Sequence, residues 1–525
     1  MKSNIIKYIF IIFVITIMGF VIYQSTSEKQ SKEPQQKISN KEEDIIKEIT
    51  LGIAEFDTIN PILSNNKQVQ EITKTIYEPL LELDSEYKIQ KCLIEDWAKT
   101  GETTYLIKLR NDIKWSDGQV FTAEDVIFTI DTLKNVESIY SNNVKNIVKT
   151  TKIDFNTIQI TTDQEIPFFE YNLIFPIMSK KFYEGENFLK TVKNNQPLGT
   201  GKYKITQNNA GTIILSKNEN YKREELTLEK ITINKYPNLS ELYNAFKTRK
   251  IDLMTTTNIG IEKYIGTIGY NKVELSGREH DFLAINTQSD ILSNKEVRQS
   301  IAKAINKENI VRQIYNNKYK VTNYFLDYGN WLKGETGETS YNQELSKQIL
   351  LENGWEYKYN KWQKKINYST KRINLKLVVP ESNQERILVA EMIKANLEEI
   401  GIKITIIKAN NDQYQNYLKN KNYDMILTGT VIGTSPNLET FFGIDNLANF
   451  SNEELSKIIN EVKNITKEEI LKEKYKRIRE IYNEEVPYIG LYNNYYAIMS
   501  NWTLKGNISP NWYNIFLNIN NWYKS

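Results

Sequence analysis

The sequence predicts an α/β protein in which strands and helices alternate around mixed sheets. Residues 375–428 carry this prediction, because short β-branched or apolar runs there alternate with longer amphipathic stretches. We predict strands at Leu375–Val379, Ile402–Ile407 and Tyr423–Thr428, and helices at Gln384–Ile400 and Asp412–Leu418. Gly401 is a suitable C-cap for the first of these helices. Strand–helix–strand units of this length indicate a parallel sheet.

Several further elements are predicted from periodicity and capping residues. Ile49–Phe56 alternates weakly and is predicted as the first strand, which an Asn60–Pro61 turn ends. A helix follows from Val69, since apolar residues recur there at helical spacing. Thr122 with Asp125, and Ser293 with Glu296, have the spacing of capping boxes ahead of apolar helices.

The second half of the chain contains a buried strand and a charged helical tail. Phe282–Thr287 is predicted as a buried strand, and Glu241–Leu253 as a helix followed by a short strand. Asn452–Glu485 is predicted to be helical with a solvated, charged face. Pro487–Ile498 supplies one more strand near the end of the chain.

Length and composition allow several domains and disfavour nucleic acid as a partner. The chain has 525 residues, enough for roughly three domains at about 150 residues each. Hydrophobic residues make up 40% and charged residues 25%, which is sufficient for a packed core. The net charge of +3 results from 68 basic and 65 acidic residues. A nucleic-acid-binding protein would need a clustered basic excess, so we expect no such partner.

Cysteine and histidine are too rare for most catalytic and metal sites. The single cysteine, Cys92, excludes an intramolecular disulfide, and His280 is the single histidine. Zinc sites and Ser/His or Cys/His nucleophilic centres draw on these residue types. The sequence contains neither GxxxxGK[ST] nor GxGxxG after a strand. We therefore expect no enzyme, no cofactor and no protein-held metal.

The N-terminus predicts export and anchoring. Residues 5–23 form an apolar run whose only charge is Lys7, and Lys2 and Lys7 place the N-terminus on the cytoplasmic side. The uncharged part of this run, Tyr8–Tyr23, is near the lower limit for a transmembrane helix, about 17–25 residues. Gln24–Ser27 matches a signal-peptide cleavage site poorly. We predict a membrane anchor over residues 1–23, with a cleaved signal as the alternative, and a disordered tether over 24–48 with a reach of roughly 25–30 Å.

Several segments resemble one known family. Tyr105–Val126 reads YLIKLRNDIKWSDGQVFTAEDV, and Gly199–Tyr203 reads GTGKY. Together they resemble the signature of the large bacterial solute-binding proteins that deliver oligopeptides to ABC importers, the peptide/nickel-binding family 5. Glu296–Val311 and the Asn353–Gly354–Trp355 helix end resemble further family segments in the same order, so the resemblance extends from Ile49 to about Leu517.

The resemblance implies a two-lobed, hinged, periplasmic-binding-protein-like fold of class II, the large cluster with an extra subdomain. It places residues 49–70, 196–275 and 489–525 in the core of lobe I, residues 71–195 in the extra subdomain, and residues 276–488 in lobe II. The strand at Pro487–Ile498 would then return to the first lobe, so the chain would cross between the lobes at least twice.

The resemblance also implies a function. It predicts a monomeric extracytoplasmic receptor that closes around an oligopeptide and delivers it to ABC permease subunits in the membrane. No cysteine lies just after the apolar run, since the only one is Cys92, so we do not expect the lipoprotein anchor that is usual for the family in single-membrane bacteria. Two alternatives stay open: binding of a chelated metal, of the nickel type, or of another small solute, and a sensor or interaction role without transport. His280 is a candidate contact for a metal chelate, with a structural role as the alternative.

The predicted ligand site has two walls. In open α/β sheets ligands bind beyond the carboxyl ends of strands. Gly429–Thr434 follows a predicted strand and contains two glycines, which permit close backbone approach by an extended peptide or merely shape a turn. The loop after the first strand supplies polar donors for the other wall, unless it is only a solvated loop. The predicted ligand-binding residues are Asn65, Asn66, Lys67, Gly429, Thr430, Val431, Gly433 and Thr434.

The chain departs from the peptide-binding pattern of the family at this segment. Peptide binders commonly have Gly-Trp-x-x-Asp there, and the Asp captures the amino terminus of the peptide. Alignment on Gly429 places Thr430 at the Trp and Gly433 at the Asp. The lost charge-assisted hydrogen bond is worth roughly 1.5–3 kcal/mol. Another acid would have to hold the amine, and the candidates nearest in sequence are Glu55, Asp57 and Glu439.

Overall fold

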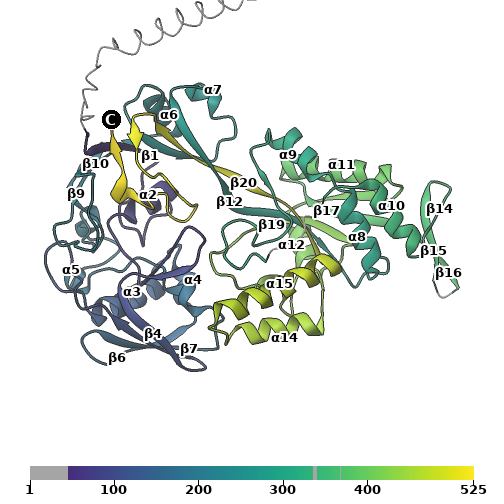
Figure 1. Ribbon diagram of the computed structural model, residues 1–525, viewed down its shortest axis with the longest axis horizontal. Helices are drawn as coiled ribbons and strands as arrows, with labels where there is room; N and C mark the ends of the chain where they lie inside the picture. The colour runs from purple at the N-terminus through teal and green to yellow at the C-terminus, as the bar shows by residue number, and fades with distance from the viewer. Residues whose placement is uncertain (1–44, 335–339, 367) are drawn as a thin grey trace, which may run out of the picture. The chain divides into compact units, whose positions relative to one another are not determined.

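The computed structural model describes residues 45–334, 340–366 and 368–525 of the chain. Within this part a large mixed sheet has the strand order β18-β17-β19-β12-β20-β11-β1-β10-β9-β8, with β13 beside β20 (Figure 1). Its strands are β1 (Glu48–Ala54), β8 (Tyr203–Asn208), β9 (Thr212–Lys217), β10 (Lys230–Tyr236), β11 (Leu253–Thr256), β12 (Tyr270–Ile285), β13 (Lys320–Val321), β17 (Asn374–Pro380), β18 (Lys403–Ala409), β19 (Met425–Val431) and β20 (Tyr488–Asn501).

The helices of the described residues pack beside this sheet and beside the smaller sheets. They are α2 (Lys67–Thr73), α3 (Ala123–Asn135), α4 (Ser141–Val144), α5 (Lys180–Tyr183), α6 (Leu239–Lys247), α7 (Glu262–Ile265), α8 (Lys295–Ala304), α9 (Lys307–Tyr315), α10 (Gln343–Glu352), α11 (Gln384–Glu399), α12 (Asn411–Asn420), α13 (Glu439–Phe442), α14 (Glu453–Val462) and α15 (Glu468–Glu485). Three 3-10 turns are η1 (Phe169–Leu173), η2 (Val192–Asn195) and η3 (Ile519–Asn521).

The shorter strands form small separate sheets. One has the order β4-β5-β7-β6, from β4 (Ile94–Gly101), β5 (Thr104–Leu109), β7 (Thr157–Thr162) and β6 (Ile147–Lys152). The others pair β2 (Leu81–Leu83) with β3 (Ile89–Lys91), β21 (Leu504–Lys505) with β22 (Tyr523–Lys524), and β14 (Glu356–Lys358) with β15 (Lys361–Ile366) and β16 (Ser369–Arg372).

Two long antiparallel strands join the two halves of the large sheet. β12 and β20 pair from Tyr270 with Asn501 to Ala284 with Tyr488, and Figure 1 shows them running side by side from the half with α6 and α7 to the half with α8 to α12. The prediction of a strand at 282–287 was therefore too short at its start, since β12 begins at Tyr270. The polar first half of β12 is held by β20 rather than by an apolar pattern of its own.

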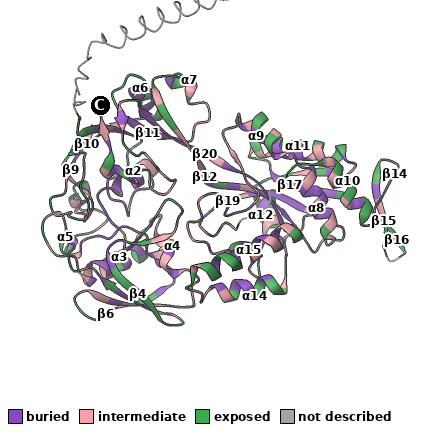
Figure 2. Cartoon of the chain, viewed as in Figure 1, coloured by how far each residue is buried: buried purple, intermediate pink, exposed green. Residues whose placement is uncertain are grey.

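Both faces of the second half of the sheet are buried. Along β12, Leu283 and Ile285 belong to one hydrophobic cluster, while Phe282 and Ala284 belong to another on the opposite face. This alternation is the two-residue period of a strand with helices on both sides. Figure 2 shows the central strands largely buried and the outer helices exposed on one side.

The alternating pattern at 374–431 folds as predicted. β17 pairs in parallel with β18 and with β19, and α11 and α12 connect them. Gly401 has φ +89 after α11, and its N–H bonds to the carbonyl of Glu398, so it ends the helix as expected. β19 runs to Val431 rather than ending at Thr428, because β12 continues beside it.

One of the two predicted capping boxes is present. Thr122 caps α3, its hydroxyl accepting from the N–H of Glu124 while Asp125 accepts from the N–H of Thr122. The second was wrong: the N-cap of α8 is Asn294, one residue later than Ser293. The Ser293 hydroxyl donates instead to the carbonyl of Asp290, which a preceding turn brings within reach.

The segment Gly199–Tyr203 has a close-packing role. A Cβ on Gly199 or Gly201 would overlap with the backbone of Ile76. Ile76 accepts from the N–H of Gly201 at 2.8 Å, and Gly199 accepts from the N–H of Ser116 at 3.0 Å. Because the glycines have no side chain, this segment packs closely between the turn beside the buried Trp115 and the residues after α2.

The predicted tether extended too far toward the fold. Ile46 forms a β-bridge with Lys524, and β1 begins at Glu48. Residues 46–48 are therefore part of the fold. The predicted anchor over residues 1–23, and the tether up to residue 44, lie outside the described residues. In the described ranges no helix is long and apolar enough to cross a membrane.

Candidate functional site

A cavity of about 390 Å³ lies where β12 and β20 pass between the two halves of the sheet. The residues after the carboxyl end of β11, the start of α11 just after β17, and side chains of β12, β20 and α9 all contribute to it. Such a position, beyond the carboxyl ends of strands, is the usual place for a ligand in open α/β sheets. The lining consists of Thr257, Asn258, Ile259, Glu279, Asp281, Ile314, Tyr315, Tyr319, Asn383, Glu385, Arg386, Tyr492 and Asn494.

A bidentate ion pair forms the floor of this cavity. Arg386 donates from Nε and Nη2 to the two oxygens of Asp281, at 2.9 and 2.6 Å. Both side chains are mostly buried, with 21% and 16% exposed. Burial opposes the charge on Arg386, but the hydrogen bonds and charge of Asp281 outweigh it and raise the pKa of Arg386. The pair is therefore a fixed, charged element, in the fork geometry that Arg and carboxylate favour.

Tyrosine rings form a second wall. Tyr315 and Tyr319 stack with ring centroids 3.8 Å apart, and Tyr492 packs against both. The hydroxyls of Tyr315 and Tyr492 lie 3.1 Å apart, and Tyr492 donates to Asp281 at 3.3 Å. Burial raises the pKa of Tyr319 to about 12, so its phenol stays neutral at ordinary pH. These rings give a ligand a rigid aromatic surface.

Two further carboxylates give the cavity an acidic character. Glu279 and Glu385 are exposed, and their carboxylates have no ion pair or hydrogen bond with any described residue. The charged lining residues are then three carboxylates and one guanidinium, a balance of −2. Such a lining attracts a cationic group through low-dielectric walls that focus the field.

None of the residues of the predicted segment Gly429–Thr434 is among those that line this cavity, and Gly429 lies beside the ion pair of Asp281 and Arg386. Gly429 lies in β19 opposite Asp281, and a Cβ there would overlap with Asp281 and Arg386. Thr430 and Val431 pair with His280 and Glu279, so these residues are inside the strand rather than in a turn after it. The pairing of β19 with β17 stops at Ile426. Beyond that residue the outer edge of β19 has no strand beside it in the described part of the chain.

Gly433 and Thr434 lie beyond the strand. Gly433 is exposed, and a Cβ there would face open space. The carbonyls of Ile432 and Gly433 accept from the guanidinium of Arg278, which also donates to the carbonyl of Tyr328. Arg278 is buried and lies 4.9 Å from the ring centroid of Tyr87. The Arg278 side chain thus already donates to the carbonyls at Gly433, the position where peptide binders of the family have the Asp.

The residues predicted in the loop after the first strand are largely held by hydrogen bonds and contacts within the fold. Asn66 caps α2 and donates to the carbonyls of Ala54 and Glu55. Lys67 donates to the carbonyl of Trp512 at 2.9 Å and lies 4.0 Å from the centroid of its ring. Asn65 is exposed. None of the three is among the residues that line the 390 Å³ cavity.

The acids suggested by sequence proximity are mostly committed elsewhere. Asp57 accepts from the Ser64 hydroxyl and the N–H of Asn65. Glu439 forms an ion pair with Lys463 at 2.9 Å. Glu55 is exposed in a left-handed conformation, φ 53. The site acids were missed because Glu279 and Asp281 lie in the strand β12 and Glu385 lies in the first turn of α11, just after β17. The rule that ligands bind beyond the carboxyl ends of strands, applied to the end of β17, could have found Glu385.

His280 is a structural residue. It is 1% exposed, its Nδ1 lies 2.8 Å from Asn493 Oδ1, and its ring packs against Phe282 and Phe325. Burial lowers its pKa to about 4. These contacts support the structural role for His280, because buried aromatic side chains enclose its imidazole ring. Among the described residues no group of three or more His, Cys, Asp or Glu side chains could hold a metal ion.

Fold and cavity together define a two-lobed, periplasmic-binding-protein-like solute-binding protein. Residues 88–451 match the family described as bacterial extracellular solute-binding proteins, family 5 Middle. The chain therefore belongs to the bacterial extracellular solute-binding proteins of family 5, and the resemblance inferred from the sequence is confirmed. The predicted fold class is confirmed as well.

Relatives and solved structures agree with this assignment. The oligopeptide-binding protein AppA of Bacillus subtilis is 21% identical over 522 residues, covering 93% of this chain and 94% of AppA. The periplasmic murein tripeptide binding protein MppA, in its unliganded open form, has a TM-score of 0.79 at 16% identity, covering 91% of this chain and 98% of that one. A nickel ABC transporter structure from Bacillus halodurans has a TM-score of 0.76 at 19% identity, covering 91% and 100%. These relatives are named as binding or transport proteins.

Proposed function

We propose that the chain is an extracytoplasmic receptor of an ABC importer that binds oligopeptides in the 390 Å³ cavity and delivers them to permease subunits. The observation that carries the proposal is the acidic lining at the carboxyl ends of the strands. Family membership and the printed names of relatives such as AppA support the peptide as the ligand class.

Glu279 and Glu385 are proposed to hold the amino terminus of the peptide. Gly433 cannot supply a carboxylate, whereas these two side chains line the cavity without a partner among the described residues. A charge-assisted hydrogen bond to an ammonium contributes roughly 1.5–3 kcal/mol. The free outer edge of β19 after Ile426 would pair with the peptide main chain, which is a sequence-tolerant mode of binding.

Calorimetric titration of the full chain tests this proposal. Short peptides should bind the native protein, and the same peptides with an acetylated amino terminus should bind at least tenfold more weakly. Combining Glu279→Gln with Glu385→Gln should remove that difference. The matched control is Glu381→Gln, since Glu381 is exposed after β17 but does not line the cavity. Equal binding of free and acetylated peptides to the native chain would contradict amine capture.

The predicted residues of the β19 segment can be tested separately. Because the space at Gly433 is open, Gly433→Trp is compatible with the fold. If the peptide extends along the β19 segment, this variant should abolish binding and leave the unfolding transition in place. Unchanged affinity would confine the site to the 390 Å³ cavity, which Gly433 does not line. Native mass spectrometry of the purified chain gives the complementary measurement. A set of bound peptides supports peptide transport, whereas a single metal-containing or small adduct would favour the chelate alternative.

We also propose that residues 1–23 hold the protein at the cytoplasmic membrane. The apolar run with lysines at its start supports this part of the proposal. Fractionation should recover the protein at full mass with membranes. Recovery of a soluble form lacking residues 1–27 would instead favour a cleaved signal.

A further inference from the structure

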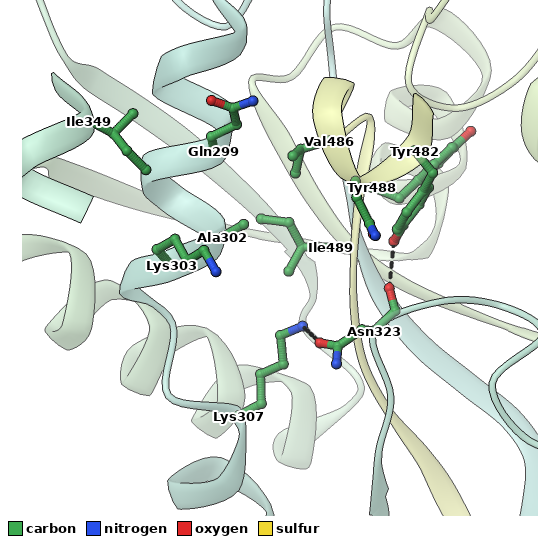
Figure 3. Close-up of a pocket in the computed structure, with 11 residues that line it drawn as sticks. Gln299, Ala302, Lys303, Lys307, Asn323, Ile349, Tyr482, Val486, Tyr488 and Ile489 are labelled. Atoms are coloured by element: carbon green, nitrogen blue, oxygen red, sulfur yellow. Dashed lines mark hydrogen bonds between the residues drawn. The ribbon is translucent and has the colours of Figure 1, made fainter. Parts of the chain in front are cut away.

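A second, smaller cavity of about 280 Å³ lies among α8, α9, α10, the end of α15 and the start of β20 (Figure 3). It shares no lining residue with the 390 Å³ cavity. Its lining residues are Gln299, Ala302, Lys303, Lys307, Asn323, Ile349, Tyr482, Asn483, Val486, Tyr488 and Ile489. Nothing in the proposed peptide receptor function uses this space.

Lys307 is a buried cation with unused hydrogen-bonding capacity. Its side chain belongs to a residue that is only 4% exposed. Its ammonium donates to Asn323 Oδ1 at 2.6 Å, drawn as a dashed line in Figure 3. An ammonium has three donors, so two have no acceptor among the described residues. Buried charges are ordinarily paired, because desolvation of an isolated ion costs several kcal/mol.

Asp327, one of two acids whose charge acts on Lys307, is already paired with other groups. Asp327 forms an ion pair with Arg479 and accepts from the backbone N–H groups of Asn323 and Tyr324. Asn323 is held in place by these bonds and by the Tyr482 hydroxyl, which donates to its carbonyl at 2.8 Å. The Asn323 acceptor of Lys307 is therefore fixed, and Lys307 itself lines the cavity.

A second ammonium faces the same space. Lys303 comes from α8, and Figure 3 shows its amino group pointing toward the same cavity as that of Lys307. The lining contains two lysines and no carboxylate. Burial lowers the pKa of Lys307 to about 8; Glu308 and Asp327 oppose this shift, and the charge of Lys303 adds to it. Two cations in one cavity repel each other until an anion lies between them.

Much of the remaining lining of the cavity is apolar. Ala302, Ile349, Val486 and Ile489 line it together with tyrosine rings. An inorganic anion would leave this surface uncovered. The volume is slightly below the roughly 300–1,000 Å³ of usual ligand pockets, which favours a single ring or a short chain.

We propose that this cavity binds a small organic carboxylate, with the carboxylate between Lys303 and Lys307 and the apolar part against Val486 and Ile489. The amide of Asn323 stays as the fixed partner of Lys307 and orients its ammonium. The site is independent of peptide binding and would take its ligand whether or not the larger cavity is filled.

Calorimetry on the full chain tests the site with benzoate, benzamide and inorganic phosphate as probes. Benzoate should bind, and benzamide and phosphate should bind at least tenfold more weakly, because one lacks the charge and the other the apolar part. Lys303→Gln should weaken benzoate binding at least fivefold. Lys295→Gln is the matched control on the same helix, since Lys295 is exposed and paired with Glu484. Absence of saturable benzoate binding, or identical binding by Lys303→Gln, would overturn the proposal.

A labelling experiment on the unaltered protein removes any dependence on how variants fold. Trace acetylation followed by peptide mass spectrometry reports the reactivity of each lysine. Benzoate should slow labelling of Lys303 and Lys307 at least threefold and leave Lys295 unchanged. Equal labelling of all three lysines with and without benzoate would refute the site.

Discussion

The single histidine gives the fold a specific dependence on pH. His280 is enclosed between Phe282, Phe325 and Asn493. The Asn493 amide donates to the Ser276 hydroxyl, which leaves its Oδ1 to accept from Nδ1–H of the imidazole. Nε2 is buried without a partner among the described residues. A second proton would therefore place both a charge and an unpaired N–H donor in the core.

The size of the effect follows from the pKa difference. Burial lowers the pKa of His280 from 6.5 to about 4 in the folded protein, and the nearby Asn493, Asp281 and Asp327 only partly oppose it. As pH falls through 6.5 the unfolded chain takes up the proton and the folded chain does not, so the free energy of unfolding decreases. The loss is about 2 kcal/mol at pH 5 and approaches about 3 kcal/mol below pH 4. Above pH 7 the imidazole is neutral in both states, so His280 no longer makes the free energy of unfolding depend on pH.

Urea unfolding of the native chain and of His280→Gln at pH 7.5 and pH 5 measures this term. The variant has a fixed packing cost, so the informative quantity is how the difference between the two proteins changes with pH. We expect the native chain to lose about 2 kcal/mol more than the variant. Equal losses would refute the argument. So would an NMR titration of the imidazole with a midpoint near its ordinary value, and no assignment is needed because the chain has one histidine.

Three other outcomes follow from the structure. Gly429→Ala should reduce the free energy of unfolding by about 1–3 kcal/mol and separate Asp281 from Arg386, measured by denaturation and by loss of peptide binding. Thr122→Ala removes the cap of α3 and should cost about 1 kcal/mol in the same denaturation assay. The depressed pKa of Lys307 means that the unfolded chain holds its proton longer, so stability should rise from pH 8 to 10.5 by up to about 3 kcal/mol, a rise that Lys307→Met removes.

The elements with a local pattern could be predicted from the sequence. β17, α11, β18, α12 and β19 each have their own apolar period, and the sequence placed them to within a few residues. β12 differs, because its first half is polar and is ordered by pairing with β20, more than 200 residues away in the chain. The prediction of the N-cap of α8 was wrong by one residue, because Ser293 and Asn294 are both suitable N-cap residues and the sequence does not decide between them.

The predicted site residues show the same limit. Asn66 and Lys67 were candidates because they are polar donors in a loop at the end of a strand. Their partners include the carbonyl of Trp512, which lies 445 residues away in the sequence, so no local pattern reveals that Lys67 is engaged. Domain boundaries and ligand contacts stay predictions, since they depend on such distant pairings.

The irregular part of β12 explains why the cavity acids escaped prediction and why they lie where they do. The register of β12 against β20 shifts between Ser276 and His280, and Gly277 there leaves no room for a Cβ beside Asn494. A bulge of this kind re-aims side chains and is common next to binding sites. Here Arg278 is directed to the carbonyls after β19, while Glu279 is left at the 390 Å³ cavity. The strand that connects the two halves of the sheet thus also sets the charge of the site, so a change that restored regular pairing would alter ligand binding and the connection together.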